Sequence, residues 1–119
     1  MQRISETVKH LLIINCIFFL ASLIVGESMY DFFALHFPDS PKFEYWQIIT
    51  HMFMHGDFSH ILFNMIGLLM FGTPMEQMWG KNKFIFYYLS TGLGAALLQI
   101  TIYYYQVNLV NEFFSDLNL

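Results

Sequence analysis

Residues 46–64 read WQIITHMFMHGDFSHILFN, and they combine three histidines and an asparagine with the start of a long apolar segment. Within a helix, His60 and Asn64 lie one turn apart on the same face. If that helix enters a membrane at Phe58, its rise puts His60 about 3 Å and Asn64 about 9 Å below the start. Polar groups at such depths are costly and usually face a bundle interior or a water-filled cavity. The pair is therefore the first functional candidate.

The composition is that of a membrane protein. Hydrophobic residues make up 56% of the chain and charged residues only 12%, against about 25% charged residues in an ordinary soluble domain. The net charge is -4 and the five Lys and Arg are scattered, which excludes a nucleic-acid-binding protein. Cys16 is the single cysteine, so neither an intrachain disulfide nor a thiol metal cluster is expected.

Three long segments contain no Asp, Glu, Lys or Arg: 10–26, 58–75 and 84–111. Each has about the 20 residues that a helix needs to cross a hydrocarbon core of about 30 Å. We therefore predict an all-α membrane protein in which the whole chain, 1–119, forms a single membrane domain. The predicted spans cover about 10–26, 58–77 and 84–106.

The basic residues indicate the orientation of these spans. Arg3 and Lys9 precede the first span, and Lys81 and Lys83 lie between the second and third, so four of the five basic residues share one side. The positive-inside rule assigns that side to the cytoplasm. We expect an integral, multi-pass membrane protein with a cytoplasmic N-terminus and an outside C-terminus.

The connection 27–57 falls on the outer side and is unusually aromatic for a solvated loop. Aromatic rings suit the membrane interface, so we expect this loop to be membrane-associated. Pro38 and Pro41 prevent one continuous helix through it. Short helical pieces are therefore predicted.

The chemistry of the polar residues leaves three interpretations open. His60 and Asn64 could hydrogen-bond between helices as structural contacts. His51, His55 and His60 could bind zinc, although no Glu follows His51 as in an H-E-x-x-H motif and a helix break is expected at 56–57. Thirdly, the imidazole N–H and the amide NH₂ could both donate to an oxyanion without carrying charge into lipid.

The spacing of several residues together resembles a known family. The segment from Thr50 to Asn64, followed by three further matching residues, is similar to the second transmembrane segment of the rhomboid intramembrane serine proteases, including their H-x-x-x-N signature. The three further residues are Gly72, Glu76 and Gly80. The resemblance implies a rhomboid-like helical bundle, with three transmembrane helices present of an expected six or more.

The resemblance also implies a function and site residues. A rhomboid-type serine endopeptidase cleaves transmembrane substrates with a serine and histidine dyad. His60 and Asn64 would contribute to its oxyanion hole, and His51 and His55 would be supporting residues near the active-site water. The implied partners are transmembrane protein substrates and the lipid bilayer, with no cofactor and no metal, in the bacterial inner (cytoplasmic) membrane.

Three other positions take their roles from the same resemblance. In that family the first loop lies partly in the membrane and carries a Trp-Arg pair. Trp46 matches the tryptophan as a further supporting residue, but Gln47 stands in place of the arginine, which leaves open how the loop is anchored. Glu76 would be a structural residue that caps or braces the connection to the third span.

The family's nucleophile and base are missing from this sequence. The nucleophile belongs to a G-x-S-G motif on the fourth span, and only Ser28, in the sequence Gly-Glu-Ser-Met, even begins one. The base is a histidine on the sixth span, and no histidine follows His60. We therefore expect the 119-residue chain to be inactive on its own and to be the N-terminal portion of a rhomboid protease.

A second hypothesis is a catalytically inactive rhomboid-like membrane protein that binds transmembrane helices. The third predicted span carries small residues four apart, Ser90 with Gly94 and Gly92 with Ala96. Small residues at this spacing let a neighbouring helix approach closely.

Overall fold

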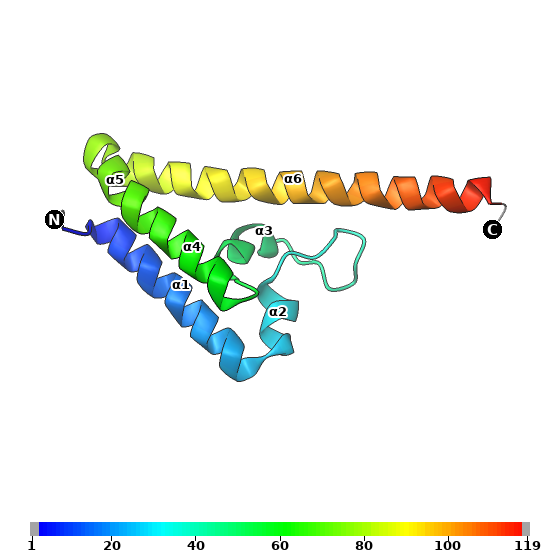
Figure 1. Ribbon diagram of the computed structural model, residues 1–119, viewed down its shortest axis with the longest axis horizontal. Helices are drawn as coiled ribbons and strands as arrows, with labels where there is room; N and C mark the ends of the chain where they lie inside the picture. Colours follow the sequence, from blue (N-terminus) through cyan, green and yellow to red (C-terminus); the bar gives the residue numbers. More distant parts are fainter. Residues whose placement is uncertain (1–2, 118–119) are drawn as a thin grey trace.

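The computed structural model describes residues 3–117, and within that range it contains helices and no strand (Figure 1). Two of the helices are long and continuous, and the others are short or joined end to end. In chain order the elements are α1 (Glu6–Val25), α2 (Glu27–Phe33), α3 (Gln47–Thr50), η1 (His51–Phe53), α4 (Phe58–Gly67), η2 (Leu68–Gly72), α5 (Thr73–Trp79) and α6 (Lys81–Asp116).

Three helical segments are long and apolar enough to cross a membrane: Glu6–Val25, Phe58–Trp79 and Lys81–Asp116. The second of them is α4, η2 and α5 in one continuous run. In Figure 1, α1 runs beside α4, while the C-terminal half of α6 extends away from the other helices. The chain is an all-α, multi-pass membrane protein, as the sequence predicts.

A carboxylate ties the start of α1 to α5. Thr7 Oγ1 donates a hydrogen bond to Glu76 Oε2 at 2.6 Å, and the Thr7 N–H donates to Oε1 at 3.2 Å. The first N–H groups of a helix have no partner within it, and a negative charge is favoured near them. The sequence analysis predicted that Glu76 caps or braces the connection to the third span. That prediction is wrong, because the Glu76 side chain caps the start of α1.

The second span contains one widened turn, η2. Pro74, just after it, has no N–H to bond the carbonyl four residues earlier, and helices are commonly distorted at such points. Gly72 within this turn lies against α1 and α6. A Cβ atom on Gly72 would lie 2.8 Å from Val8 Cγ2 and 3.3 Å from Phe84 Cζ. The three spans therefore come into contact around Gly72.

The connection between α1 and α4 contains the expected short helices, α2, α3 and η1. Its loop, 34–46, reaches across to α6, where the Phe37 ring packs on Tyr103 and Tyr104 at centroid distances of 5.2 and 4.6 Å. The connection thus contacts the third span and does not extend freely from the bundle.

Candidate active site

The start of α4 is fixed by a helix cap. The side chain of Asp57 accepts a hydrogen bond from the His60 N–H at 2.7 Å, which is the usual contact of an N-cap residue. Because the helix begins at Phe58, His60 lies in its first turn and Asn64 one turn later. The preceding turn, η1, ends at Phe53, so His55 comes from non-helical backbone.

These residues surround one cavity of about 480 Å³. It lies between α1, the segment 51–55, α4 and α6. Eight polar side chains line it: Asn15, His51, His55, His60, Asn64, Tyr88, Thr91 and Gln99. The structure therefore brings the two predicted oxyanion residues and the two supporting histidines to the same space.

Trp46, the remaining predicted supporting residue, does not line this cavity. Its Nε1 donates to the carbonyl of Phe32 at 2.7 Å, and its ring packs on that of Phe32 at 4.9 Å. Trp46 therefore holds α3 against the end of α2, away from the histidines.

His60 and Asn64 both have unused donors. Neither the His60 ring nor the Asn64 amide hydrogen-bonds to any residue between 3 and 117, and both side chains are exposed where they border the cavity. An imidazole N–H and an amide NH₂ can each donate one or more hydrogen bonds while neutral. One of the three interpretations was that these two side chains hydrogen-bond between helices. Neither side chain makes such a hydrogen bond among residues 3–117.

His51 is attached to α6. Its Nε2 lies 3.2 Å from the carbonyl oxygen of Gly92, and because a carbonyl only accepts, Nε2 carries a proton in this contact. Burial lowers the pKa of the His51 imidazole. The neighbouring Met52 side chain packs directly on Gly92, where a Cβ atom would clash with it. The cavity wall formed by η1 is thus fitted to a glycine of α6.

His55 is the most buried histidine of the group, with 3% of its surface exposed. Its ring stands edge-to-face against that of His60, with centroids 5.4 Å apart. Burial lowers the pKa of His55, and the nearby His60 lowers it further because two adjacent positive charges repel. Both effects favour a neutral imidazole beside the cavity.

The histidines do not form a metal site with one another. Among the residues that the structure describes, no three His, Cys, Asp or Glu side chains are grouped so that they could hold one ion. His51 instead points its Nε2 at Gly92. The zinc interpretation of the three histidines therefore lacks the geometry that it needs.

The sequence analysis did not predict four of the eight polar lining residues: Asn15, Tyr88, Thr91 and Gln99. Asn15 had a usable signal, because a polar side chain within an apolar span is a functional candidate by the same rule that selected His60. It is completely buried and its Nδ2 donates to the Leu11 carbonyl at 2.7 Å. Within the described part of the chain, no serine lines the cavity.

Comparison with known proteins identifies the family. A family model described as the Rhomboid domain matches residues 42–109, which is more than half of the chain. The chain belongs to the rhomboid family. The matched residues include α3, the segment with the cavity histidines, and the whole second span, so the family match contains both His60 and Asn64.

Individual rhomboid relatives match the same region in part. The chain is 31% identical over 65 residues to the rhomboid protease AarA of Providencia stuartii, and 38% identical over 64 residues to the rhomboid protease GlpG of Salmonella newport. It is 32% identical over 54 residues to the rhomboid protease GluP of Bacillus subtilis. These matches cover 55%, 54% and 45% of this chain, but only 23%, 23% and 11% of the relatives.

Proposed function

We propose that this rhomboid chain supplies the oxyanion part of an intramembrane serine endopeptidase that cleaves transmembrane substrates. The observation that carries the proposal is the pair of side chains with unused donors, His60 and Asn64, at one cavity. During peptide hydrolysis the carbonyl oxygen becomes negative in the tetrahedral intermediate, and donors waiting at that position lower the barrier. Neutral donors are suited to a span, because no charge has to be placed in lipid.

The serine nucleophile and the histidine base of this enzyme are proposed to lie on helices outside the sequence 1–119. No G-x-S-G motif and no histidine after His60 occur in it. Without nucleophile and base, only oxyanion and binding contributions to catalysis remain. The 119-residue chain by itself is therefore expected to be inactive towards peptide bonds.

The reading frame that follows Leu119 in the gene provides the first test. The protease proposal expects a G-x-S-G motif and a later histidine in frame. A stop codon directly after Leu119 in intact genomic DNA would contradict the protease proposal and favour a non-catalytic role.

Replacing Asn64 by Ala tests the oxyanion role. In the complete protease, Asn64→Ala is expected to lower turnover of a transmembrane substrate by about 100 to 1,000 fold, the usual effect of losing one oxyanion donor. Asn108→Ala is the matched control, because Asn108 is exposed on α6 and does not line the cavity. Turnover should be measured in lipid vesicles with both variants. Equal turnover in the two would remove Asn64 from this role.

A non-catalytic protein that binds transmembrane helices is the second candidate. The third span carries two pairs of small residues. In the pair Gly92 and Ala96, Gly92 is covered by Met52 and Ala96 is fully buried. A Cβ atom added at Gly94, in contrast, would meet no atom within 4 Å, and Ser90 is exposed. The Ser90 and Gly94 face is therefore open to a close helix–helix contact.

Photocrosslinking from position 94 tests this candidate. A crosslinking residue at 94 should capture a partner transmembrane helix, while one at Leu89, on a different face of α6, should not. Capture of no membrane protein from position 94 would count against helix binding.

We also propose that the protein lies in the bacterial cytoplasmic membrane with its N-terminus in the cytoplasm. The relatives compared above come from bacteria. Four of the five basic residues fall on the same side of the membrane as the N-terminus in the proposed topology.

A further inference from the structure

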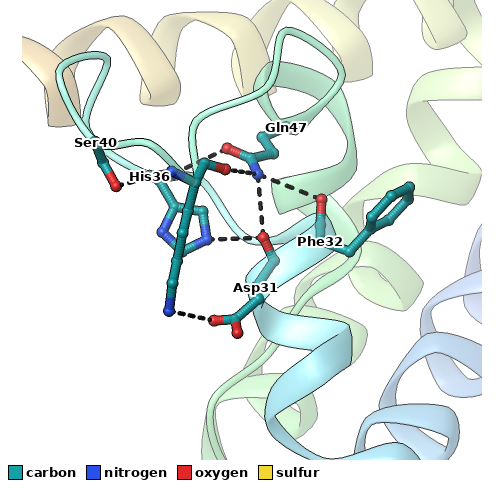
Figure 2. A network of polar contacts seen from close by, with 6 residues as sticks. Asp31, Phe32, His36, Ser40 and Gln47 are labelled. Atoms are coloured by element: carbon teal, nitrogen blue, oxygen red, sulfur yellow. Dashed lines mark hydrogen bonds and ion pairs between the residues drawn. The ribbon is translucent and has the colours of Figure 1, made fainter.

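Gln47, the first residue of α3, is completely buried in the outer connection. Its Oε1 accepts hydrogen bonds from the His36 N–H at 3.3 Å and from the Glu44 N–H at 3.1 Å. These two amides belong to opposite ends of the loop 34–46. One acceptor atom therefore closes the loop. Figure 2 shows the contact with His36.

The other end of the same amide bonds to carbonyl groups. Gln47 Nε2 donates to the carbonyl of Lys42 at 2.9 Å, and lies 3.3 and 3.4 Å from the carbonyls of Asp31 and Phe32 (Figure 2). The last carbonyls of a helix have no partner within it, and Asp31 and Phe32 are in the last turn of α2. Gln47 thus joins the end of α2 to the loop.

Two neighbours of Gln47 extend this cap. Trp46 Nε1 donates to the Phe32 carbonyl at 2.7 Å, and Thr50 Oγ1 donates to the Phe33 carbonyl at 2.7 Å. Together with Gln47, these side chains bond to three consecutive carbonyls at the end of α2. α3 is fixed in position by these contacts, with Gln47 at their buried centre.

The cavity wall continues directly from this point. α3 ends at Thr50 and η1 begins at His51, so the histidine that bonds to Gly92 follows Gln47 by about one helical turn. The Tyr30 hydroxyl of α2 also donates to the His55 carbonyl at 2.9 Å. The connection between α2 and α3 therefore determines where His51 and His55 stand.

We propose that Gln47 is a positioning residue for the cavity. We further propose that it must be a neutral amide, because its oxygen accepts from two N–H groups while its two amide hydrogens point towards the carbonyls of Lys42 and of the end of α2. The arginine that the rhomboid resemblance leads one to expect here would not replace it in this chain. The connection to catalysis rests on the proposed function, whereas the hydrogen-bond requirement itself does not.

Three substitutions of Gln47 distinguish the role of the amide oxygen as an acceptor from that of the amide NH₂ as a donor. Gln47→Met keeps the length but removes both donor and acceptor. Gln47→Glu keeps an acceptor for His36 and Glu44 but, when ionised, faces the α2 carbonyls without a proton to donate. Gln47→Arg keeps donors for the carbonyls but leaves the two amide N–H groups against a cation with no acceptor.

Amide hydrogen exchange on the 119-residue chain in lipid nanodiscs measures these effects. In Gln47→Met and Gln47→Arg the His36 and Glu44 amides should exchange at least about tenfold faster than in the unaltered protein, because each loses its hydrogen bond to the Gln47 oxygen. In Gln47→Glu they should stay protected. Gln106→Met, on the exposed part of α6, is the matched control and should change neither amide.

The imidazole signals of His51 and His55, followed by NMR during a pH titration, measure positioning. Burial lowers the pKa of both groups, so Gln47→Met should move both midpoints towards the ordinary value, and Gln106→Met should not. A loss of amide protection without any movement of these midpoints would overturn the positioning role. Continued amide protection in Gln47→Arg would overturn the requirement for a neutral amide. Neither readout depends on turnover, so both results are independent of the Asn64→Ala test.

Discussion

His55 and His60 illustrate how two similar side chains can be given different environments by the backbone around them. His55 is buried in a non-helical segment, held by the Tyr30 hydroxyl on its carbonyl. His60 stands in the first turn of α4 and borders the cavity. Because their rings are 5.4 Å apart, charging both would bring two cations together at low dielectric. Burial and the nearby His60 therefore lower the pKa of the His55 imidazole, which favours its neutral form.

Folding should consequently become less favourable in mild acid. The pKa values of His51 and His55 are lowered in the folded chain, the first by burial, the second by burial and by His60. The unfolded chain, with ordinary histidines near a pKa of about 6.5, then binds more protons as the pH falls below that value. The free energy of unfolding is therefore highest above the histidine pKa of the unfolded chain. It decreases as the pH drops towards the lower pKa values of His51 and His55 in the folded chain.

Thermal unfolding in detergent between about pH 7.5 and 5.5 checks this prediction, since carboxyl groups titrate mainly below that window. The unfolding temperature should fall as the pH is lowered from about 7.5 to 5.5. In the double variant His51→Gln with His55→Gln, it should fall by less. An unaltered protein with the same midpoint at both ends of the window would contradict it.

At the scale of residues, the sequence predicted His60 and Asn64 at the cavity because their spacing is a local property of one helix. It also predicted that His51 and His55 would lie near them. It could not predict that the Gln47 amide would be buried and would hydrogen-bond to several segments. Its hydrogen-bond partners lie up to 16 residues away in the sequence, and they are backbone groups, which carry no sequence signal. Asn15 was missed although its polarity within a span was visible, since its place at the cavity depends on how α1 packs on α6.

The second span is the helical element whose structure departs from the sequence-based prediction. Its apolar run predicts one regular helix, whereas the structure inserts the widened turn η2 between α4 and α5. The extra residue in such a turn alters which side chains share a face beyond it. Pro74 was the available signal, and the contact of Gly72 with α1 and α6 was not visible in the sequence.

Gly72 and Gly67 form a matched pair for testing this contact. Gly72→Ala should destabilise the folded protein by about 1 to 3 kcal/mol, because the added methyl group overlaps the stiff Val8 side chain in a packed interface. Gly67→Ala, in the same span, has no atom within 4 Å of the new methyl group and should be neutral or stabilising by up to about 1 kcal/mol. The measurement is the unfolding free energy of both variants in the same detergent. If Gly72→Ala were as stable as Gly67→Ala, the close approach of the spans would be refuted.

On the scale of the whole molecule, α6 is longer than a membrane is thick. Its 36 residues span about 54 Å, against a hydrocarbon core of about 30 Å. Beginning near Phe84, about 20 residues bring the helix to the tyrosines at 103–105, and such rings prefer the interface. Phe37 of the loop 34–46 packs on these tyrosines. We therefore expect the loop and the tyrosines to lie at one membrane surface, with the last part of α6 beyond it.

Cysteine labelling of the chain in intact cells tests this placement. In a Cys16→Ser background, a membrane-impermeant maleimide should label Asp39→Cys and Val110→Cys from outside, because the proposed orientation places both positions at or beyond the outer surface. Asn82→Cys, in the first turn of α6 at its proposed cytoplasmic end, should be labelled only after the membrane is permeabilised. Leu97→Cys, exposed on the surface of the folded chain, should resist labelling in both cases because lipid covers it. Labelling of position 82 in intact cells would reverse the orientation, and labelling of position 97 would show that this part of α6 lies in water.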